Sequence, residues 1–144
     1  MEMQKKRFGI TDIILIIISI VYIIGMLTFI KPCGPAEDGS FMTCHWAGQA
    51  VLGIAALLAV NALIHMITSD AKVKIGLDLS MIPAAALAAL LPGHLIPLCM
   101  MSNMRCQAVM KPGTLIFGIL VAAGVLIDLV NQIRMIKKHN RISD

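Results

Sequence analysis

Four ionisable side chains interrupt stretches of sequence that are otherwise almost entirely apolar: Asp12, His65, Asp78 and Asp128. Aspartate and histidine can hold or pass a proton, and such residues inside a membrane often mark an ion pathway. Each lies four to six residues from a charged residue near the end of its apolar stretch, which is roughly 6–9 Å along a helix at ~1.5 Å per residue. Asn61 and Asn131 lie within about one turn of this level, so the sequence predicts one polar layer to which each of four helices contributes a residue.

Three interpretations of this intramembrane polar layer stay open: structural pairing, a proton or ion relay, and contact with a partner. Asp78 lies four residues after Lys74, so the two side chains can pair on one helix face. Asp12 lies near the start of its helix, where negative charge is favoured. A buried, unpaired carboxylate is costly, and a contact between His65 and Asp128 would relieve that cost.

Four cysteines form two groups outside the apolar stretches: Cys33 with Cys44, and Cys99 with Cys106. Local pairing within each group is the simplest of the three possible connectivities, and it predicts two disulfide-closed loops. A membrane thiol–disulfide oxidoreductase is the alternative interpretation, because exchange can pass electrons between two cysteine pairs. However, the spacings are C-x10-C and C-x6-C, and the Cys-x-x-Cys spacing of such enzymes does not occur.

Soft ligands gather in the same two segments, which allows a copper-binding interpretation. Thiolate and thioether sulfur suit Cu(I), and imidazole can join them. The candidate ligands are Met42, Cys44, His45, Met104 and Cys106. Methionine is also a common apolar filler, and oxidised cysteines do not ligate metals. We therefore expect no cofactor and retain copper as an alternative.

The composition determines what kind of chain must position these residues. Hydrophobic residues make up 58% of the 144 residues and charged residues 14%, and the mean hydropathy is +0.87. Soluble domains carry roughly 45–50% apolar and about 25% charged residues. The composition thus excludes a soluble enzyme, and the distribution of basic residues at chain ends and junctions disfavours nucleic-acid binding.

Four stretches are long enough to cross a bilayer, which needs about 20 apolar residues in a helix. They cover residues 10–30, 47–68, 75–97 and 113–135. We expect an all-α antiparallel four-helix bundle forming a single transmembrane domain over residues 1–144. Pro83 should kink the third span, and Pro92-Gly93 should end its regular helix. Ala84, Ala85, Ala86, Ala88 and Ala89 should pack closely against Gly118 and Ala122 of the fourth span.

The distribution of positive charge predicts the orientation. Nine of the 12 Lys and Arg residues flank one side, namely Lys5, Lys6, Arg7, Lys72, Lys74, Arg134, Lys137, Lys138 and Arg141. The other side has Lys31, Arg105 and Lys111. The positive-inside rule then places both termini in the cytoplasm and all four cysteines outside, at the plasma membrane.

The outer segments contain short motifs that resemble a known family. These are Met42-Thr43-Cys44-His45-Trp46, Leu95-Ile96-Pro97-Leu98-Cys99, Asn103-Met104-Arg105-Cys106 and Lys111-Pro112-Gly113. The pattern resembles a family of small four-span prokaryotic membrane proteins known as a domain of unknown function, number 4418. The resemblance implies the span count and outer cysteines. The resemblance also implies that members of the family are often encoded beside exporters with MacB-like permeases.

Together these features predict a non-enzymatic integral membrane protein in contact with the lipid bilayer. The expected role is that of an accessory partner of a larger envelope complex, such as a MacB-like ABC exporter with its permease. The thiol–disulfide oxidoreductase and the copper-binding protein remain the alternatives.

Overall fold

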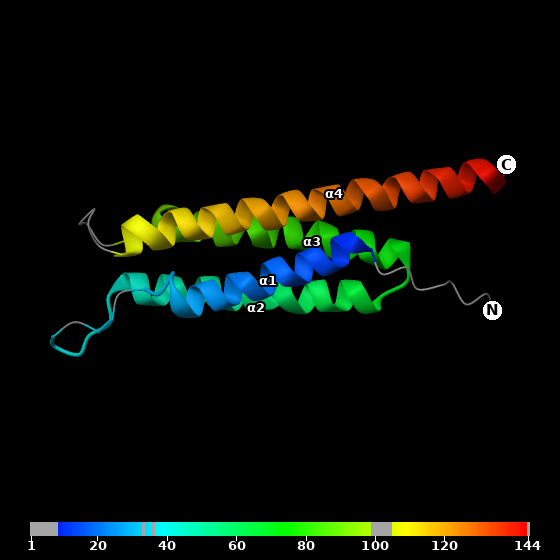
Figure 1. The fold of residues 1–144 in the computed structure, drawn as a ribbon. Helices are drawn as coiled ribbons and strands as arrows, with labels where there is room; N and C mark the ends of the chain where they lie inside the picture. The colour runs from blue at the N-terminus through cyan, green and yellow to red at the C-terminus, as the bar shows by residue number, and fades with distance from the viewer. Residues whose placement is uncertain (1–8, 33, 36, 99–104, 144) are drawn as a thin grey trace.

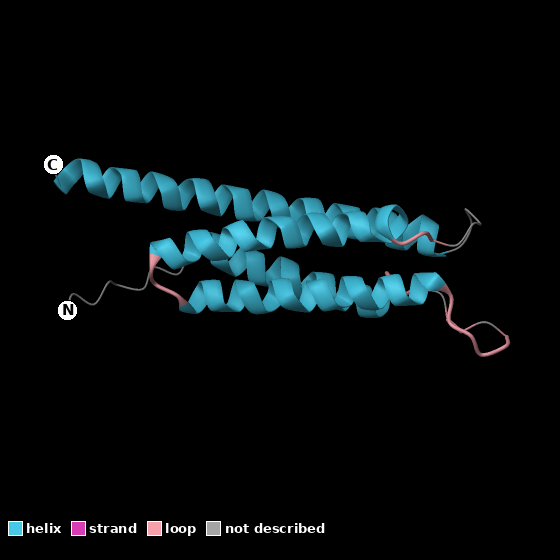
Figure 2. Cartoon of the chain, turned by 180° about the vertical axis from the view of Figure 1, so that it is seen from behind, coloured by secondary structure: helices cyan, strands magenta, loops and turns pink. Residues whose placement is uncertain are grey.

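The chain folds into four long helices that run up and down. The computed structural model describes residues 9–32, 34–35, 37–98 and 105–143. The helices are α1 (Ile10–Thr28), α2 (Thr43–Ile67), α3 (Ala71–Leu90) and α4 (Lys111–Ser143), with π-helical turns η1 (Leu91–Leu95) and η2 (Cys106–Met110). Figure 1 shows the start of α1 and the end of α4 at the same end of the bundle, as four antiparallel spans require. Loops lie only at the two ends of the bundle (Figure 2).

All four helices are long and apolar enough to cross a membrane. Only 28–33% of the residues in their apolar windows are buried inside the bundle. Large apolar side chains cover the outside of the helices instead, as Ile17, Ile24 and Ile119 illustrate. An apolar exterior of this extent is stable in lipid rather than in water. The chain is therefore a multi-pass membrane protein in contact with the bilayer, as the composition predicts.

Each helix buries one narrow stripe of residues spaced three or four apart. In α1 the stripe is Asp12, Leu15, Ser19, Tyr22 and Met26, and the other helices follow the same rule. This spacing keeps one face of each helix toward its neighbours. The α1 helix packs mainly on α2, α3 packs mainly on α4, and smaller α1–α4 and α2–α3 contacts close the bundle.

Small residues bring α3 and α4 very close together. A Cβ atom added to Gly118 would lie 2.7 Å from Cβ of Ala89 and 3.0 Å from the carbonyl oxygen of Ala85. The predicted alanine surface of the third span and the glycine of the fourth are thus in direct contact. Close approach of this kind replaces the hydrophobic effect as the attraction between helices in lipid.

The helix ends differ from the predicted spans in ways that the sequence explains. The α3 helix ends at Leu90 rather than at residue 97, because Pro92 (ψ 116°) and Gly93 (φ 84°) leave helical geometry. Pro83 lies inside α3. The α2 helix starts earlier than predicted, at Thr43, and α4 runs to Ser143 rather than to residue 135. Polar residues at the start of α2 and the end of α4 shorten the apolar stretch, but the backbone is helical through them.

The two expected disulfides fall partly on residues that the structure does not describe. Cys33 and Cys99 lie outside the described residues. Their expected partners, Cys44 and Cys106, are both fully buried, at the start of α2 and in η2. The pairing Cys33–Cys44 and Cys99–Cys106 thus stays a prediction.

Candidate ion-binding site

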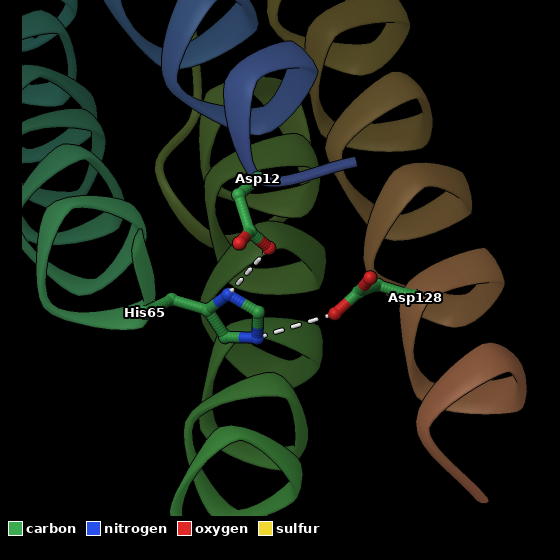
Figure 3. A group of neighbouring side chains, drawn as sticks. All are labelled: Asp12, His65 and Asp128. Atoms are coloured by element: carbon green, nitrogen blue, oxygen red, sulfur yellow. Dashed lines mark ion pairs between the residues drawn. The ribbon is translucent and has the colours of Figure 1, made fainter. Parts of the chain in front are cut away.

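A cluster of buried polar side chains lies at the end of the bundle where α1 begins and α4 ends. It contains one buried acidic or imidazole side chain from every helix: Asp12, His65, Asp78 and Asp128. The imidazole of His65 is central to it. Its Nδ1 lies 3.0 Å from Oδ1 of Asp12, and its Nε2 lies 3.2 Å from Oδ1 of Asp78 and 3.2 Å from Oδ2 of Asp128. Figure 3 shows the ring of His65 between Asp12 and Asp128.

The four side chains meet because each belongs to the buried stripe of its helix. Asp12 precedes Leu15 by three residues in α1, and His65 follows Ala62 by three in α2. In α3, Asp78 precedes the buried Met81 by three, and in α4 Asp128 follows the buried Val125 by three. Because the helices run antiparallel, the ends of these four stripes reach the same level.

A fifth charged group completes the cluster. Lys74 of α3 is 7% exposed, and its Nζ lies 2.8 Å from Oδ2 of Asp12. The sequence-based pairing of Lys74 with Asp78 is therefore wrong as to the partner, since the lysine reaches across to α1. Asp12 also accepts a hydrogen bond from the backbone N–H of Gly9 at 3.3 Å, which agrees with the expected role of an acidic residue near the helix start.

Asp128 has two partners that the sequence did not single out. The hydroxyl of Thr11 donates to its Oδ1, and Gln132, one turn further along α4, is buried and interacts with its carboxylate. The expected layer member Asn131 is instead exposed, and Asn61 is half-buried. The three-to-four spacing from Val125 and Asp128 to Gln132 was the signal that could have identified the glutamine.

Several polar atoms of the cluster lack a well-aligned hydrogen bond among the described residues. Both ring nitrogens of His65 and both carboxylate oxygens of Asp78 are in this group, together with Oδ1 of Asp12 and Oδ2 of Asp128. Asp78 is 0% exposed, and among the described residues the contact with His65 compensates for burial of its carboxylate. Buried polar atoms are nearly always satisfied in proteins, and exceptions often mark a functional site.

The charges of the cluster do not balance. Three carboxylates share the site with one ammonium group and one imidazole. With a protonated imidazole the sum is one negative charge, and with a neutral imidazole it is two. A buried net charge is strongly unfavourable. The cluster is therefore suited to take up positive charge.

The proposed soft-metal ligands lie at the opposite end of the bundle and are only partly described. The ring of His45 contacts two other aromatic rings, with centroid distances of 4.3 Å to Phe41 and 5.7 Å to Trp46. Cys44 and Cys106 are buried and Met42 is exposed, whereas Met104 lies outside the described residues. Trp46 is 62% exposed, as suits an anchor at the membrane interface.

A comparison with known families agrees with this architecture. The family model described as Domain of unknown function (DUF4418) matches residues 15–131, which is most of the chain. The chain belongs to the DUF4418 family. No curated protein and no solved structure matches it. The DUF4418 match includes His65, Asp78 and Asp128, whereas Asp12 and Thr11 lie just before it.

Proposed function

We propose that this DUF4418 protein is a non-enzymatic accessory subunit of a larger envelope complex at the plasma membrane. The chain has four spans and short segments between them. Among the described residues, its buried ionisable groups are gathered where the helices contact one another. An architecture of this kind is suited to binding another membrane protein.

The observation that carries the proposal is the end of α4. The helix has 33 residues, or about 50 Å at ~1.5 Å per residue, whereas the apolar core of a bilayer is ~30 Å thick. Among the side chains of α4 that the structure describes, Gln132 is the last buried one. Beyond it Ile133 and Met135 are 51% and 58% exposed, and the helix end projects past the turn between α2 and α3 (Figure 1). A long exposed helix end with apolar and basic side chains is suited to dock on a partner.

The same proposal assigns an orientation and a partner class. The excess of positive charge near the termini supports a cytoplasmic location for the end of α4. The opposite end of the bundle then faces outward, where two disulfides would close the segments around Cys44 and Cys106. A permease of an ABC exporter of the MacB-like type is the partner that the family resemblance favours.

The alternative functions have less support. Thiol exchange needs an accessible thiolate, whereas Cys44 and Cys106 are 0% exposed. Copper binding by the outer segments needs several ligands, and His45 is engaged with aromatic rings. Neither arrangement favours redox or soft-metal chemistry at the outer end.

Co-purification tests the accessory role. The full chain is tagged, extracted in mild detergent, and its bound proteins are identified by mass spectrometry. A variant with Lys137→Gln, Lys138→Gln and Arg141→Gln should lose the partner, while Lys31→Gln at the opposite end should retain it. Recovery of the chain alone at native expression, or an unchanged partner with the triple variant, would count against docking through α4.

A further inference from the structure

Two carboxylates and one imidazole nitrogen converge inside the cluster. Oδ1 of Asp78 and Oδ2 of Asp128 each lie 3.2 Å from the same atom, Nε2 of His65. A neutral imidazole offers one lone pair, and a protonated one offers a single hydrogen at Nε2. One hydrogen cannot serve both oxygens well, and neither contact is a well-aligned hydrogen bond. The convergence is thus better suited to a cation than to a proton on the ring.

The distances fit a small metal ion. Zinc binds nitrogen and oxygen ligands at about 2.0–2.2 Å in a tetrahedral arrangement, so neighbouring ligand atoms lie roughly 3.3–3.6 Å apart. The two Nε2–oxygen separations of 3.2 Å are close to this spacing. Small rotations of the Asp78 and Asp128 side chains would therefore place an ion between Nε2 of His65 and the two carboxylate oxygens.

The other ring nitrogen already has the partner that metal-bound histidines use. A ligating histidine usually directs its second N–H at a carboxylate, which fixes the orientation of the ring. Oδ1 of Asp12 lies 3.0 Å from Nδ1 of His65. Lys74 in turn holds the second oxygen of Asp12 at 2.8 Å. Asp12 and Lys74 thus form the supporting shell of the ring.

Charge balance selects a divalent ion. Three carboxylates, the Lys74 ammonium and a neutral imidazole carry two negative charges in total. A divalent cation brings this sum to zero, whereas a monovalent cation leaves one negative charge buried. The carboxylate of Asp78 is 0% exposed and has no aligned partner among the described residues, which is the condition that a bound cation would relieve.

We propose that His65 Nε2, Asp78 and Asp128 bind a first-row divalent transition-metal ion, with Asp12 and Lys74 as positioning residues. Mixed imidazole and carboxylate ligands favour such ions over Mg²⁺ and Ca²⁺, which take oxygen ligands. The site joins α2, α3 and α4 at the end of the bundle that carries the termini. It does not depend on the accessory role, and a partner can be absent without affecting it.

The test uses the full-length protein in detergent, stripped of metal and titrated with Zn²⁺ in a calorimeter. We expect one ion per chain, excess Mg²⁺ without effect, and affinity that weakens toward acidic pH because protons compete for the ligands. His65→Gln and Asp128→Asn should each weaken binding by at least about tenfold. His45→Gln is the matched control and should bind like the unaltered chain.

The outcome that overturns the proposal is equally definite. Binding that survives His65→Gln, or is lost with His45→Gln, assigns the ion elsewhere, and no binding to the unaltered chain excludes the site. Where the variants do not fold, Co²⁺ loaded into the unaltered chain decides. Visible bands of a tetrahedral nitrogen and oxygen site support the proposal, whereas a thiolate charge-transfer band points to the cysteines and contradicts it.

Discussion

Lys74 forms its ion pair with Asp12 of α1 at 2.8 Å, not with Asp78, which lies one turn away on its own helix. The pairing of Lys74 with Asp12 determines which positively charged or imidazole group each carboxylate of the cluster contacts. The ammonium neutralises the carboxylate on one side of His65, and Asp78 is left to the imidazole on the other side. The lysine thus ties α3 to α1, two helices that are not among the closely packed pairs of the bundle.

Removing the Asp12 charge should destabilise the bundle. In Asp12→Asn, the buried Lys74 loses its carboxylate partner, and breaking a buried ion pair in this way costs about 3–5 kcal/mol. The midpoint of thermal unfolding in detergent should fall clearly. Glu37→Gln is the control, because Glu37 is exposed in the segment between α1 and α2. An unchanged midpoint for Asp12→Asn would show that the pair contributes nothing.

Close packing of α3 on α4 predicts unequal effects of two glycine substitutions. Gly118→Ala adds a methyl group 2.7 Å from Cβ of Ala89, and such overpacking costs about 1–3 kcal/mol. Gly53→Ala meets nothing within 4 Å and should leave stability unchanged or slightly raised. Both are measured by thermal unfolding in one detergent. Equal effects would mean that the two helices separate at little cost.

Peptide mapping without reduction tests the outer cysteines. We expect peptides that link Cys33 to Cys44 and Cys99 to Cys106 in protein purified with a thiol-blocking reagent. Local pairs would explain why Cys44 and Cys106 are buried at the start of α2 and in η2. Crossed links between the two segments would refute local pairing, and four alkylated thiols would refute disulfides altogether.

Membrane-impermeant labelling tests the orientation. A cysteine introduced by Asn140→Cys, on the exposed end of α4, should react only after the cells are opened. The unaltered chain supplies the background from its own four cysteines. Labelling of Asn140→Cys in intact cells would reverse the orientation and place the His65 cluster at the outer face.

The turn before α2 predicts one pH effect outside the membrane. The hydroxyl and the backbone N–H of Ser40 bond to Asp38 at 2.6 and 3.0 Å and hold the pKa of its carboxyl below the ordinary value. Their contribution to stability is present above that ordinary pKa and is lost as the pH falls through the lowered one. Ser40→Ala should raise the pKa toward its ordinary value in an NMR titration, and Ser80→Ala should not.

The number of spans and the level of the polar layer could be predicted because they depend only on the positions of residues along the sequence. Apolar length specifies four helices, and counting residues from the charged boundaries puts Asp12, His65, Asp78 and Asp128 at one level. The break at Pro92 and Gly93 follows from proline and glycine chemistry alone.

The direction in which each side chain points was much harder to predict. In a span that is apolar on every face, the buried stripe has no polar opposite face to reveal it. Gln132 differs from Asn131 only in its spacing from Asp128 and Val125, and small residues such as Gly118 and Ala85 are the other markers of the stripe. The choice of Asp12 by Lys74 depends on which helices are neighbours, and one sequence does not contain that information.

The hydrogen bond between Thr11 and Asp128 joins positions that are 117 residues apart. Spans emerge from the ribosome in order, so α1, α2 and α3 enter the bilayer before Asp128 is available. During that interval the charged groups of α1, α2 and α3, namely Asp12, His65, Lys74 and Asp78, can contact one another but not Asp128. Insertion of α4 therefore completes the polar cluster during biosynthesis. A chain stalled before α4 should expose a polar patch that quality-control proteases of the membrane can recognise.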